Sequence, residues 1–365
     1  PVPLDIFSCP ADPPPSSAED ELLLTDDASY NQNGRPVPPA ALKEILGFLG
    51  KKNPELASDC GATLEDVDTG HVTGMVFVSE RDRGLETLHL ALRRPATGQV
   101  VKVLSLLGDI YGVDGGVRME DSGCIAGGFT VNGGRCAVGH SLVYVSTKEP
   151  AKTRRTPWTV VYRTDLADGK TERLTPQGQY DLSPAVSPSG KMVAVANFQK
   201  SEWNGEIENL KTDIVIMEVH WRGLGGDGRR RVIKDAGWPT WGSDNVIFFH
   251  RGVDTKDNTD WGVYRYDLTT TDTVKVTPDN VQAMTPAAID ETRVAVATVR
   301  QKSKQVEMEV ERVMDQYRHV EIFDTTTPWC SVQITQRMRP LGDHYNPFVR
   351  DNGGRIGYHR CRSDL

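Results

Sequence analysis

Hydrophobic and polar positions alternate along much of the chain, in short runs that are rich in valine, isoleucine and tyrosine. Clear examples are TVVYRTD ending at Asp165, DIVIMEV beginning at Asp213, GVYRYD ending at Asp267 and HVEIFD ending at Asp324. Because successive side chains of a β-strand point to opposite faces, this alternation predicts strands. A turn and a second short strand follow, as in KTERLTP and DTVKVTP. The pattern therefore predicts an all-β chain.

A proline-containing segment followed by a short apolar run occurs four times in the second half of the chain. The copies are SPAVSPSGKMVAVA around Pro184, WPTWGSDNVIFFH around Pro239, TPAAIDETRVAVA around Pro286 and NPFVRDNGGRIGYH around Pro347. They recur roughly every 45 to 60 residues, a spacing that is typical of propellers and other repeat arrays. We interpret each proline as part of a turn and each apolar run as the last strand of its unit. Four strands joined by short turns make a propeller blade.

Two weaker copies lie in the first half of the chain. One contains LETLHLALR, QVVKVLS and SLVYVSTKE, and the other contains LDIFSC, ELLLTDDASYNQNG and MVFVSERD. The sequence therefore predicts a single domain, residues 1–365, that folds as a six-bladed β-propeller with four-stranded antiparallel blades. The approximate blade ranges are 1–80, 85–149, 157–198, 212–251, 261–300 and 319–362.

One helical insertion is predicted in the first blade, between Pro36 and about Gly70. Within it, PPAALKEILGFLGKK has Leu42, Ile45, Leu46 and Leu49 at helical spacing on one stripe. A helix packed over the rim of the propeller is favoured over a helix that binds a partner.

Closure of the ring is a separate question, because propellers usually combine strands from both chain ends in one blade. Here LDIFSC is predicted as the first strand of the first blade and RIGYHR as the last strand of the sixth. Closure would then depend on packing between blades. The alternative is a strand upstream of Pro1 that completes the sixth blade.

Charge and hydropathy exclude some classes of partner. The net charge of −8 argues against a nucleic-acid surface, which would be basic. No stretch approaches 18 apolar residues, so no membrane span is predicted. PVPLDIFSCP lacks the basic and apolar regions of a signal peptide, although a start at Pro1 suggests a processed or shortened chain. We expect a monomer whose partner is a peptide, a protein or a small molecule.

The cysteines leave two alternatives open. None of the six, at positions 9, 60, 124, 136, 330 and 361, forms a C-x-x-C pair, which argues against a cysteine-only zinc site. Cys124 and Cys136 flank a glycine-rich segment and could form a disulfide in a secreted protein. Alternatively, all six are small apolar residues in a reducing compartment.

Candidate ligand-binding residues lie at equivalent places in the repeats. They are Asp109, Tyr111, Tyr180, Asp181, Trp238, His344 and Tyr345, with Tyr30 at the corresponding place in the first blade. If the blades are in register, these side chains surround one mouth of the channel. Aromatic rings beside polar groups suit a sugar, a peptide or a small aromatic ligand. The alternative is that they only form turns and close the channel.

Catalytic motifs are weaker. The G-x-S-x-G pentapeptide of a serine peptidase is absent. Asp109, Asp181, Asn31 and Asn346 could supply oxygen ligands to calcium, as in a lactonase-type propeller, but ordinary turn chemistry is favoured, so we predict no metal and no cofactor. The acidic segment with Glu202, Glu206 and Glu208 is either a cation-attracting flap or a solvated loop. We therefore favour a non-catalytic binding or scaffold protein, with a hydrolase or lyase at the channel mouth, metal-assisted in one version, as the alternative.

Several of these segments together resemble one family. YDLSPAVSPSGKMVAVA, GWPTW…VIFFHR, TPAA…RVAVATVR and HYNPF…GYHRCR are similar to the plant TolB-related proteins, which also resemble the N-terminal propeller of dipeptidyl-peptidase-like proteins. The resemblance covers most of the chain, from Leu4 to Leu365. It implies a TolB-like, WD40-like propeller that forms the N-terminal part of a longer protein. It also implies a secreted location, with a cytoplasmic one as the alternative, and it implies no agreed reaction.

Overall fold

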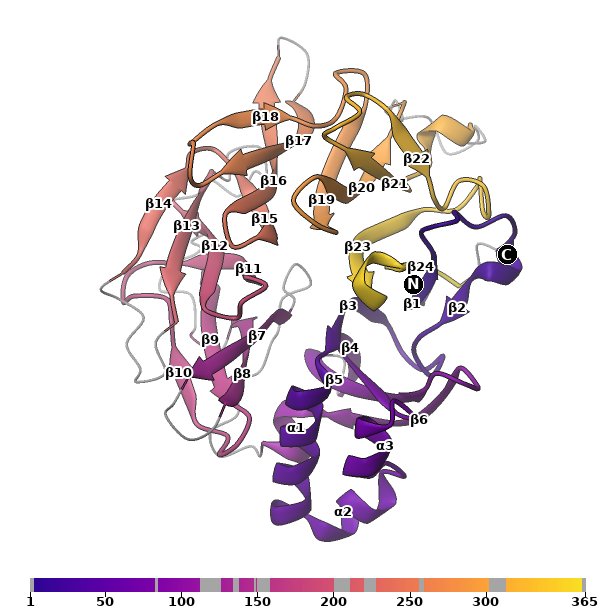
Figure 1. Cartoon of the computed structure of the whole chain (residues 1–365), viewed down its shortest axis with the longest axis vertical. Coiled ribbons are helices and arrows are strands. Elements are labelled where there is room, and N and C mark those ends of the chain that lie inside the picture. Colours follow the sequence, from indigo (N-terminus) through magenta and orange to yellow (C-terminus); the bar gives the residue numbers. More distant parts are fainter. Residues whose placement is uncertain are drawn as a thin grey trace.

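Six four-stranded antiparallel sheets stand in a ring around a central channel (Figure 1). The computed structural model describes residues 3–82, 85–111, 126–133, 138–147, 149, 158–199, 211–219, 228–255, 259–301 and 313–362. In five sheets the strands follow each other in chain order, and the first strand of each is innermost. The predicted six-bladed β-propeller is thereby confirmed.

The outermost strand is short in five of the six sheets, whereas β6 (Gln99–Ser105) has seven residues. The first three sheets are β3 (Asn31–Val37), β4 (Thr73–Asp82), β5 (Leu85–Arg94) and β6 (Gln99–Ser105); β7 (Ala126–Gly133), β8 (Val138–Ser146), β9 (Val160–Asp165) and β10 (Thr171–Arg173); and β11 (Asp181–Val186), β12 (Met192–Phe198), β13 (Thr212–Glu218) and β14 (Arg230–Ile233). The next two are β15 (Gly237–Ser243), β16 (Val246–Asp254), β17 (Thr259–Asp267) and β18 (Thr273–Lys275); and β19 (Gln282–Ala288), β20 (Arg293–Val299), β21 (His319–Asp324) and β22 (Ser331–Gln333). The closing sheet is β23 (His344–Arg350), β24 (Arg355–Cys361), β1 (Leu4–Pro10) and β2 (Leu22–Leu23).

The apolar runs that repeat in the sequence are the second strands of the sheets, and they form the core. In β12, Val195 pairs with Val215 of β13, and both side chains are buried. Both faces of such a strand meet a neighbouring sheet, so nearly every side chain is apolar. Val193 and Val195 share one apolar cluster with Val143 and Val145 of the preceding sheet. Burial of these side chains between adjacent sheets holds the ring together.

The repeated prolines lie inside the innermost strands, not in turns as predicted. Pro184, Pro239, Pro286 and Pro347 belong to β11, β15, β19 and β23. An innermost strand has a neighbour on one side only, and proline, which has no N–H, is tolerated at such an edge. The sheets are therefore offset by two strands from the predicted repeat units, because a repeating sequence does not mark where its unit begins.

The closing sheet corrects the prediction of how the ring closes. β1 pairs with β24 along its whole length, from Leu4 opposite Cys361 to Pro10 opposite Arg355, and β2 pairs with β1. LDIFSC is thus the third strand of the last sheet and not the first strand of a first one. Without β1, the edge of β24 would have unpaired backbone N–H and C=O groups.

A repeated threonine identifies β1 as a third strand. The hydroxyl oxygens of Thr175, Thr277 and Thr335 accept hydrogen bonds from the backbone N–H of the third strand of their own sheet, at Val161, Val263 and Val320, over 2.9, 3.0 and 2.9 Å. Thr25 does the same for Ile6 over 3.4 Å. Its surroundings, Leu24-Thr25-Asp26, match Leu174-Thr175-Pro176 in the sequence.

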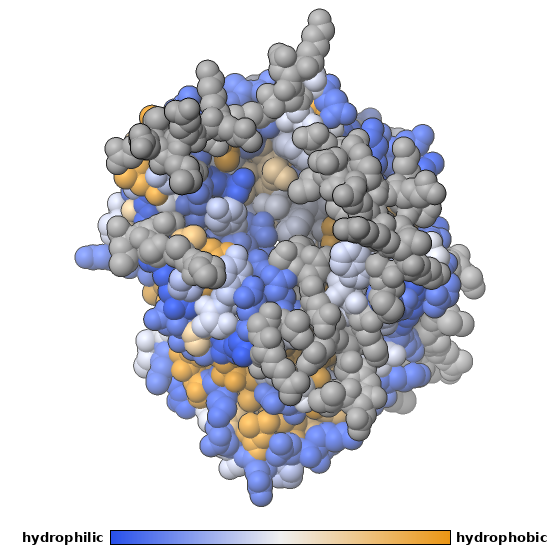
Figure 2. All heavy atoms as spheres, turned by 180° about the vertical axis from the view of Figure 1, so that it is seen from behind, coloured by the Kyte–Doolittle hydropathy of each residue, from blue (hydrophilic) through white to orange (hydrophobic). Residues whose placement is uncertain are grey.

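The predicted helical insertion is present as three helices, α1 (Pro39–Lys52), α2 (Pro54–Asp59) and α3 (Leu64–Asp68). Leu42, Ile45, Leu46 and Leu49 of α1 are buried, as the stripe predicted. Seen from behind, hydrophobic residues gather at the bottom of the molecule, where this insertion lies (Figure 2). Short 3-10 or π turns are η1 (Ala18–Asp20), η2 (Leu106–Ile110), η4 (Met314–Gln316) and η5 (Asp351–Gly353). Within the described ranges, no helix has the length and apolar character needed to cross a membrane.

Candidate functional site

The central channel contains a hollow that is open to solvent, and its empty space, part of which is open solvent, is about 410 Å³. Five of the six innermost strands line it, and each contributes two or three consecutive residues. The lining residues are Asn33, Gly34, Arg35, Ser183, Pro184, Trp238, Pro239, Thr240, Pro286, Ala287, Asn346, Pro347 and Phe348. The wall therefore combines proline and aromatic surface with amides, hydroxyls and one guanidinium, that of Arg35.

Each innermost strand is bulged at the level of this cavity. Every bulge has one residue with positive φ: Asn33 (54°), Gly128 (119°), Ser183 (47°), Trp238 (49°), Thr285 (48°) and Asn346 (45°). Positive φ is unfavourable for side chains other than glycine, most of all for a bulky one such as tryptophan. Its recurrence in all six strands shows that the bulge belongs to the architecture, and it places the bulge residues of four strands in the channel wall.

Two histidines support bulges of the neighbouring sheet: His359, which is buried, and His250, which is partly buried. Nδ1 of His359, in β24, accepts a hydrogen bond from the Asn33 N–H over 3.4 Å, and Nδ1 of His250, in β16, accepts one from the Thr285 N–H over 3.3 Å. Burial lowers the pKa of His250 to about 4, and burial, with Arg318 nearby, lowers the pKa of His359 to about 3. Both rings are therefore neutral near pH 7, as an accepting nitrogen requires.

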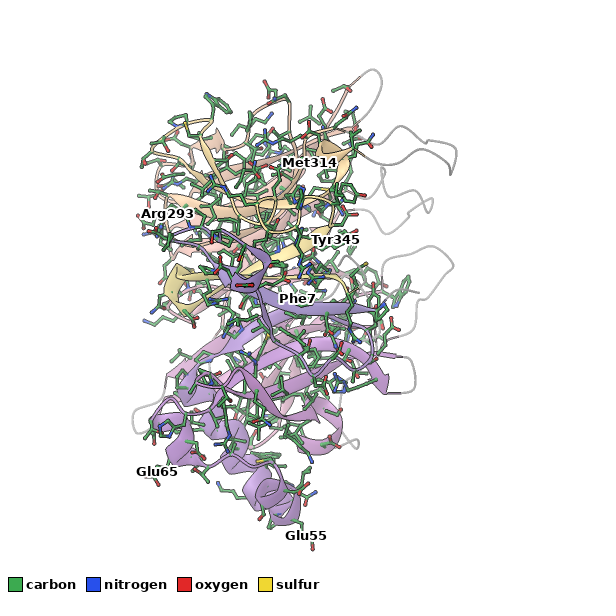
Figure 3. All side chains as sticks on the ribbon, turned by 90° about the vertical axis from the view of Figure 1, so that its right-hand side faces the viewer. Phe7, Glu55, Glu65, Arg293, Met314 and Tyr345 are labelled. Atoms are coloured by element: carbon green, nitrogen blue, oxygen red, sulfur yellow. The ribbon has the colours of Figure 1, made fainter. Side chains whose placement is uncertain are left out.

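Trp238 and Tyr345 are the two predicted residues that lie beside this wall. Trp238 lines the cavity and packs beside His250, with ring centroids 6.4 Å apart. Tyr345 stacks on His359 at 5.5 Å, and the guanidinium of Arg318 lies 4.9 Å from its ring centre. Figure 3 shows Tyr345 toward the side of the propeller opposite Arg293. The channel thus has aromatic groups near the end where the inner strands begin.

His344 is not in the channel. Its side chain is fully buried, its ring lies 5.6 Å from that of His319 and 5.1 Å from that of Tyr358, and its Nε2 has no hydrogen-bond partner among the described residues. Burial, with His319 next to it, lowers the pKa of His344 to about 3. The side chain points behind the inner strand, which the strand assignment alone could not reveal.

Asp181 also has a structural role, because its carboxylate is hydrogen-bonded to side chains in its own sheet and in segments next to it. Its carboxylate is fully buried and accepts two hydrogen bonds from Arg229 at 2.9 Å, one from Thr175 at 2.7 Å and one from Asn197 at 2.7 Å. Tyr180 immediately precedes β11, and its carbonyl accepts from the Phe198 N–H over 3.0 Å. Neither is among the residues that line the cavity.

Asp109 and Tyr111 lie at the periphery, and this corrects their predicted position at the mouth. Asp109 is exposed in η2, after the outer strand β6, and accepts from the Ser105 N–H over 2.8 Å. Tyr111 stacks on Phe48 of α1, with ring centroids 4.7 Å apart, and donates to the Leu166 carbonyl over 3.2 Å. Both residues therefore belong to the junction with the helical insertion.

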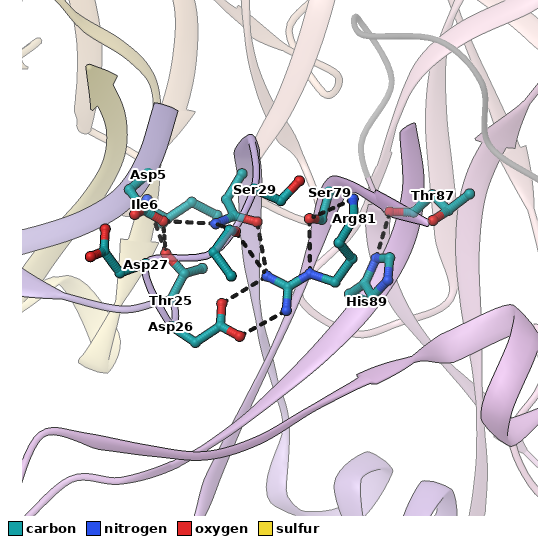
Figure 4. Close-up of polar contacts among 12 residues, drawn as sticks. Asp5, Ile6, Thr25, Asp26, Asp27, Ser29, Ser79, Arg81, Thr87 and His89 are labelled. Carbon is teal, nitrogen blue, oxygen red and sulfur yellow. Dashed lines mark hydrogen bonds and ion pairs between the residues drawn. The ribbon is translucent and has the colours of Figure 1, made fainter. Parts of the chain in front are cut away.

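The four residues considered for calcium do not converge. Asn31 donates to Asp5 over 2.8 Å and accepts from Arg81 over 3.1 Å, and Arg81 also pairs with Asp26 (Figure 4). Asn346 donates to Asn33 over 2.7 Å across the channel wall. Tyr30 lies next to Asn31, just before β3. Within the described residues, no three His, Cys, Asp or Glu side chains are close enough together to bind one metal ion.

Several predictions fall on residues outside the described ranges, namely Cys124, Cys136, Glu202, Glu206 and Glu208. The described cysteines Cys9, Cys60, Cys330 and Cys361 form no disulfide with one another. Sequence reasoning also missed Arg35 and Asn33, which line the cavity. The sequence signal that could have identified them is the alignment of Asn33-Gly34 with Ser183-Pro184 and Asn346-Pro347. This alignment can be made only when β3 is known to be an inner strand.

No protein-family model and no curated protein sequence matches the chain. Among solved structures, the chain is similar to the putative TolB from Agrobacterium tumefaciens, with a TM-score of 0.50 and 11% identity over 99% of this chain and 98% of that one. It is also similar to a puromycin hydrolase, with a TM-score of 0.49 and 13% identity over 95% of this chain and 47% of that one. A puromycin-hydrolyzing peptidase from Mycobacterium tuberculosis gives a TM-score of 0.43 and 14% identity over 94% of this chain and 56% of that one.

The chain thus spans the full length of the TolB structure but about half the length of the two hydrolases. At such identity the similarity shows the fold alone, because one fold supports many functions. The fold is that of a TolB-like six-bladed β-propeller.

Proposed function

We propose that this propeller is a non-catalytic binding module that receives a peptide, a protein segment or a small ligand at its channel mouth, with the surface loops as a second contact area. The observation that carries the proposal is the composition of the channel wall. Proline and tryptophan surfaces provide flat apolar contacts, and the amides of Asn33 and Asn346 and the Arg35 guanidinium provide directed polar groups. Concave sites with this mixture are typical of ligand binding.

The wall favours a ligand with a flat apolar group next to an oxygen-bearing group. Trp238 offers a face for stacking, and a guanidinium binds carboxylate and carbonyl oxygens well. Arg35 is the charged residue among those that line the cavity. Burial lowers its pKa to about 10, so it stays charged near pH 7. An aromatic carboxylate, or the C-terminal end of a peptide, has both features.

The alternative, a hydrolase or lyase built from Asp109, Asp181, Trp238, His344 and Tyr345, has less support. Asp109 lies on the periphery, Asp181 is bound by Arg229, and His344 is fully buried with a pKa of about 3. A general base needs access to its substrate and a pKa nearer the working pH. These residues favour binding over acid–base catalysis at the mouth.

Further parts of the proposal rest on the sequence resemblance alone. They are the relation to plant TolB-related and dipeptidyl-peptidase-like propellers, and a secreted location, with a cytoplasmic one as the alternative. The monomeric state is a prediction of the same standing.

The test uses matched fragments as probes. Benzoate and phenylacetate are compared with benzamide and phenylacetamide by saturation-transfer NMR and titration. We expect the two carboxylates to bind more tightly than the amides, Arg35→Gln to remove that preference, and Trp238→Ala to weaken all four probes. Lys170→Ala is the control, because Lys170 is exposed on an outer hairpin. Equal binding by the three variants would mean that the mouth is only structural.

A further inference from the structure

A second polar region lies on the opposite side of the ring, at the end where the inner strands finish. Arg350 is the last residue of β23 and Arg355 the first of β24, so they flank the turn between these strands. Arg93, near the end of β5, reaches the same place from the neighbouring sheet. We name these three residues the arginine cluster.

The three guanidinium groups converge on β1 and β2. Nη1 of Arg350 and Nε of Arg355 both donate to the Ser8 hydroxyl, over 3.1 and 3.3 Å, and Nη2 of Arg355 donates to the carbonyls of Ser8 and Asp20 over 2.9 and 3.2 Å. Nη2 of Arg93 donates to the carbonyls of Leu23 and Gly98 over 3.1 and 3.0 Å. Leu23 lies beside Ser8 because Leu22 is the partner of Ser8 in the ladder.

All of these acceptors are uncharged. Among the described residues, no carboxylate lies within ion-pair distance of Arg93, Arg350 or Arg355, whereas Arg360 of β24 and Arg339, which precedes β23, both bind Glu21. Arg93 is 4% exposed, and its Nε is buried with no hydrogen-bond partner. A buried guanidinium with neither a counter-ion nor a full set of acceptors is costly.

The cluster also carries like charges at close range. Burial and the proximity of Arg350 and Arg355 lower the pKa of Arg93 to about 10, and burial lowers the pKa of Arg350. Asp351 offsets part of this effect, but it is exposed. The nearby Asp20 carboxylate accepts from the N–H groups of Ser16 and Ser17. Near pH 7 the region therefore has an excess of positive charge.

We propose that the arginine cluster binds a phosphate-type oxyanion, either as free phosphate or as the phosphoryl group of a partner. A tetrahedral oxyanion offers several acceptor oxygens and neutralises more than one guanidinium, which fits the planar donor fork of arginine. Arg350 and Arg355 are partly exposed, so an anion from solvent can reach them. This site is independent of the channel and of the function proposed for it.

The test measures binding of inorganic phosphate by calorimetry, in a chloride background of constant ionic strength. We expect Arg350→Gln and Arg355→Gln to weaken phosphate binding at least about tenfold each, because each removes a charge-assisted donor. Arg293→Gln is the matched control. Arg293 is a partly exposed arginine that pairs with Asp290 on the same side of the ring, and its loss should leave phosphate binding unchanged. Phosphate should also raise the melting temperature of the wild-type protein more than chloride does.

A second arm separates the two sources of the anion. If N-acetyl-phosphoserine amide binds at least about tenfold more tightly than inorganic phosphate, the phosphoryl group of a partner is the ligand, and if it binds equally or less tightly, the ligand is the free anion. Both results support the proposal. It is overturned if the wild-type protein does not bind phosphate at concentrations up to about 10 mM. It is overturned equally if both cluster variants bind phosphate as the Arg293 variant does.

Discussion

The closing sheet and the β11–β14 sheet have the same architecture but are held together differently. In the β11–β14 sheet the buried acid Asp181 has its partners Thr175, Asn197 and Arg229 within 48 residues along the chain. In the closing sheet, the nearly buried carboxylate of Glu21 accepts from Arg360, Arg339 and Tyr358, and Glu21 and Arg360 are 339 positions apart. Asp5 pairs with Arg362 over 2.5 Å in the same sheet.

This difference indicates that the pairing of the two chain ends needs interactions that select the correct strand register. Strands joined by short turns find each other at little entropic cost, whereas joining the two ends of a long chain costs more, although the cost rises only slowly with length. Apolar strands alone could also pair in a shifted register. Charged groups that match across the closing sheet favour one register of β1 on β24, and this explains why ion pairs that join the chain ends concentrate there.

The largest effect is expected in the core that both kinds of sheet share. Val195→Asp places a charge where Val195 is fully buried in β12, without a partner, and should cost more than about 4 kcal/mol and unfold the protein. Val274→Asp is the control, because Val274 is 52% exposed on β18 and the change should cost less than about 0.5 kcal/mol. Urea denaturation followed by circular dichroism measures both. A folded, stable Val195→Asp variant would refute the assignment of β12 to the core.

The comparison itself is tested by Glu21→Gln and Asp181→Asn. Glu21→Gln removes the charge that binds two guanidinium groups, those of Arg360 and Arg339, so we expect a loss of about 3–5 kcal/mol in the free energy of unfolding. Asp181→Asn removes the charge that binds one guanidinium, that of Arg229, and should cost less. Hydrogen exchange should quicken across β1 in the first variant and around β11 in the second. If Asp181→Asn lost as much stability as Glu21→Gln or more, the ion pairs that join the chain ends would not stabilise the closing sheet more than a local ion pair stabilises its sheet.

A pH titration should reveal the histidines that support the bulges. The pKa of His250 falls from 6.5 in the unfolded chain to about 4 in the folded protein, so the unfolded state binds the extra proton. Stability that is present above about pH 6.5 is therefore lost as the pH falls toward 4, by on the order of 3 kcal/mol. His250→Gln should flatten this dependence, and His359→Gln, in the closing sheet, should flatten it down to about pH 3. An unchanged pH profile in both variants would contradict the assigned role.

The smallest effect is expected at the helical insertion. Lys102 and Asp59 form an ion pair over 2.9 Å between β6 and α2, but both side chains are solvent-exposed. Because water screens such a pair, it contributes almost nothing to the free energy of unfolding, so Lys102→Ala should leave the melting temperature unchanged within error. A clear drop in the melting temperature would show that ion pairs stabilise the docking of this insertion, as they stabilise the closing sheet.

The sequence by itself determined what depends on local pattern. The alternation of apolar and polar residues predicted the strands, and the four proline segments with the two weaker copies predicted a propeller of six sheets. The spacing of Leu42, Ile45 and Leu49 predicted the helix α1. These features are local because strand and helix periodicities are properties of neighbouring residues. Thr25 was a usable signal for the closing sheet, since its surroundings match those of Thr175.

Only the tertiary structure decided where each sheet begins, how the ring closes and which candidates reach the channel. Trp238 is itself the bulge residue of β15 and lines the cavity, whereas His344 lies two positions before Asn346, the bulge residue of β23, and is buried behind its strand. A bulge changes the direction of the side chains around it, so the side chains of these two residues point to different places. The arginine cluster brings Arg93 to Arg350 and Arg355, and β1 pairs with β24. Such contacts join residues that are hundreds of positions apart, and a local pattern contains no information about them.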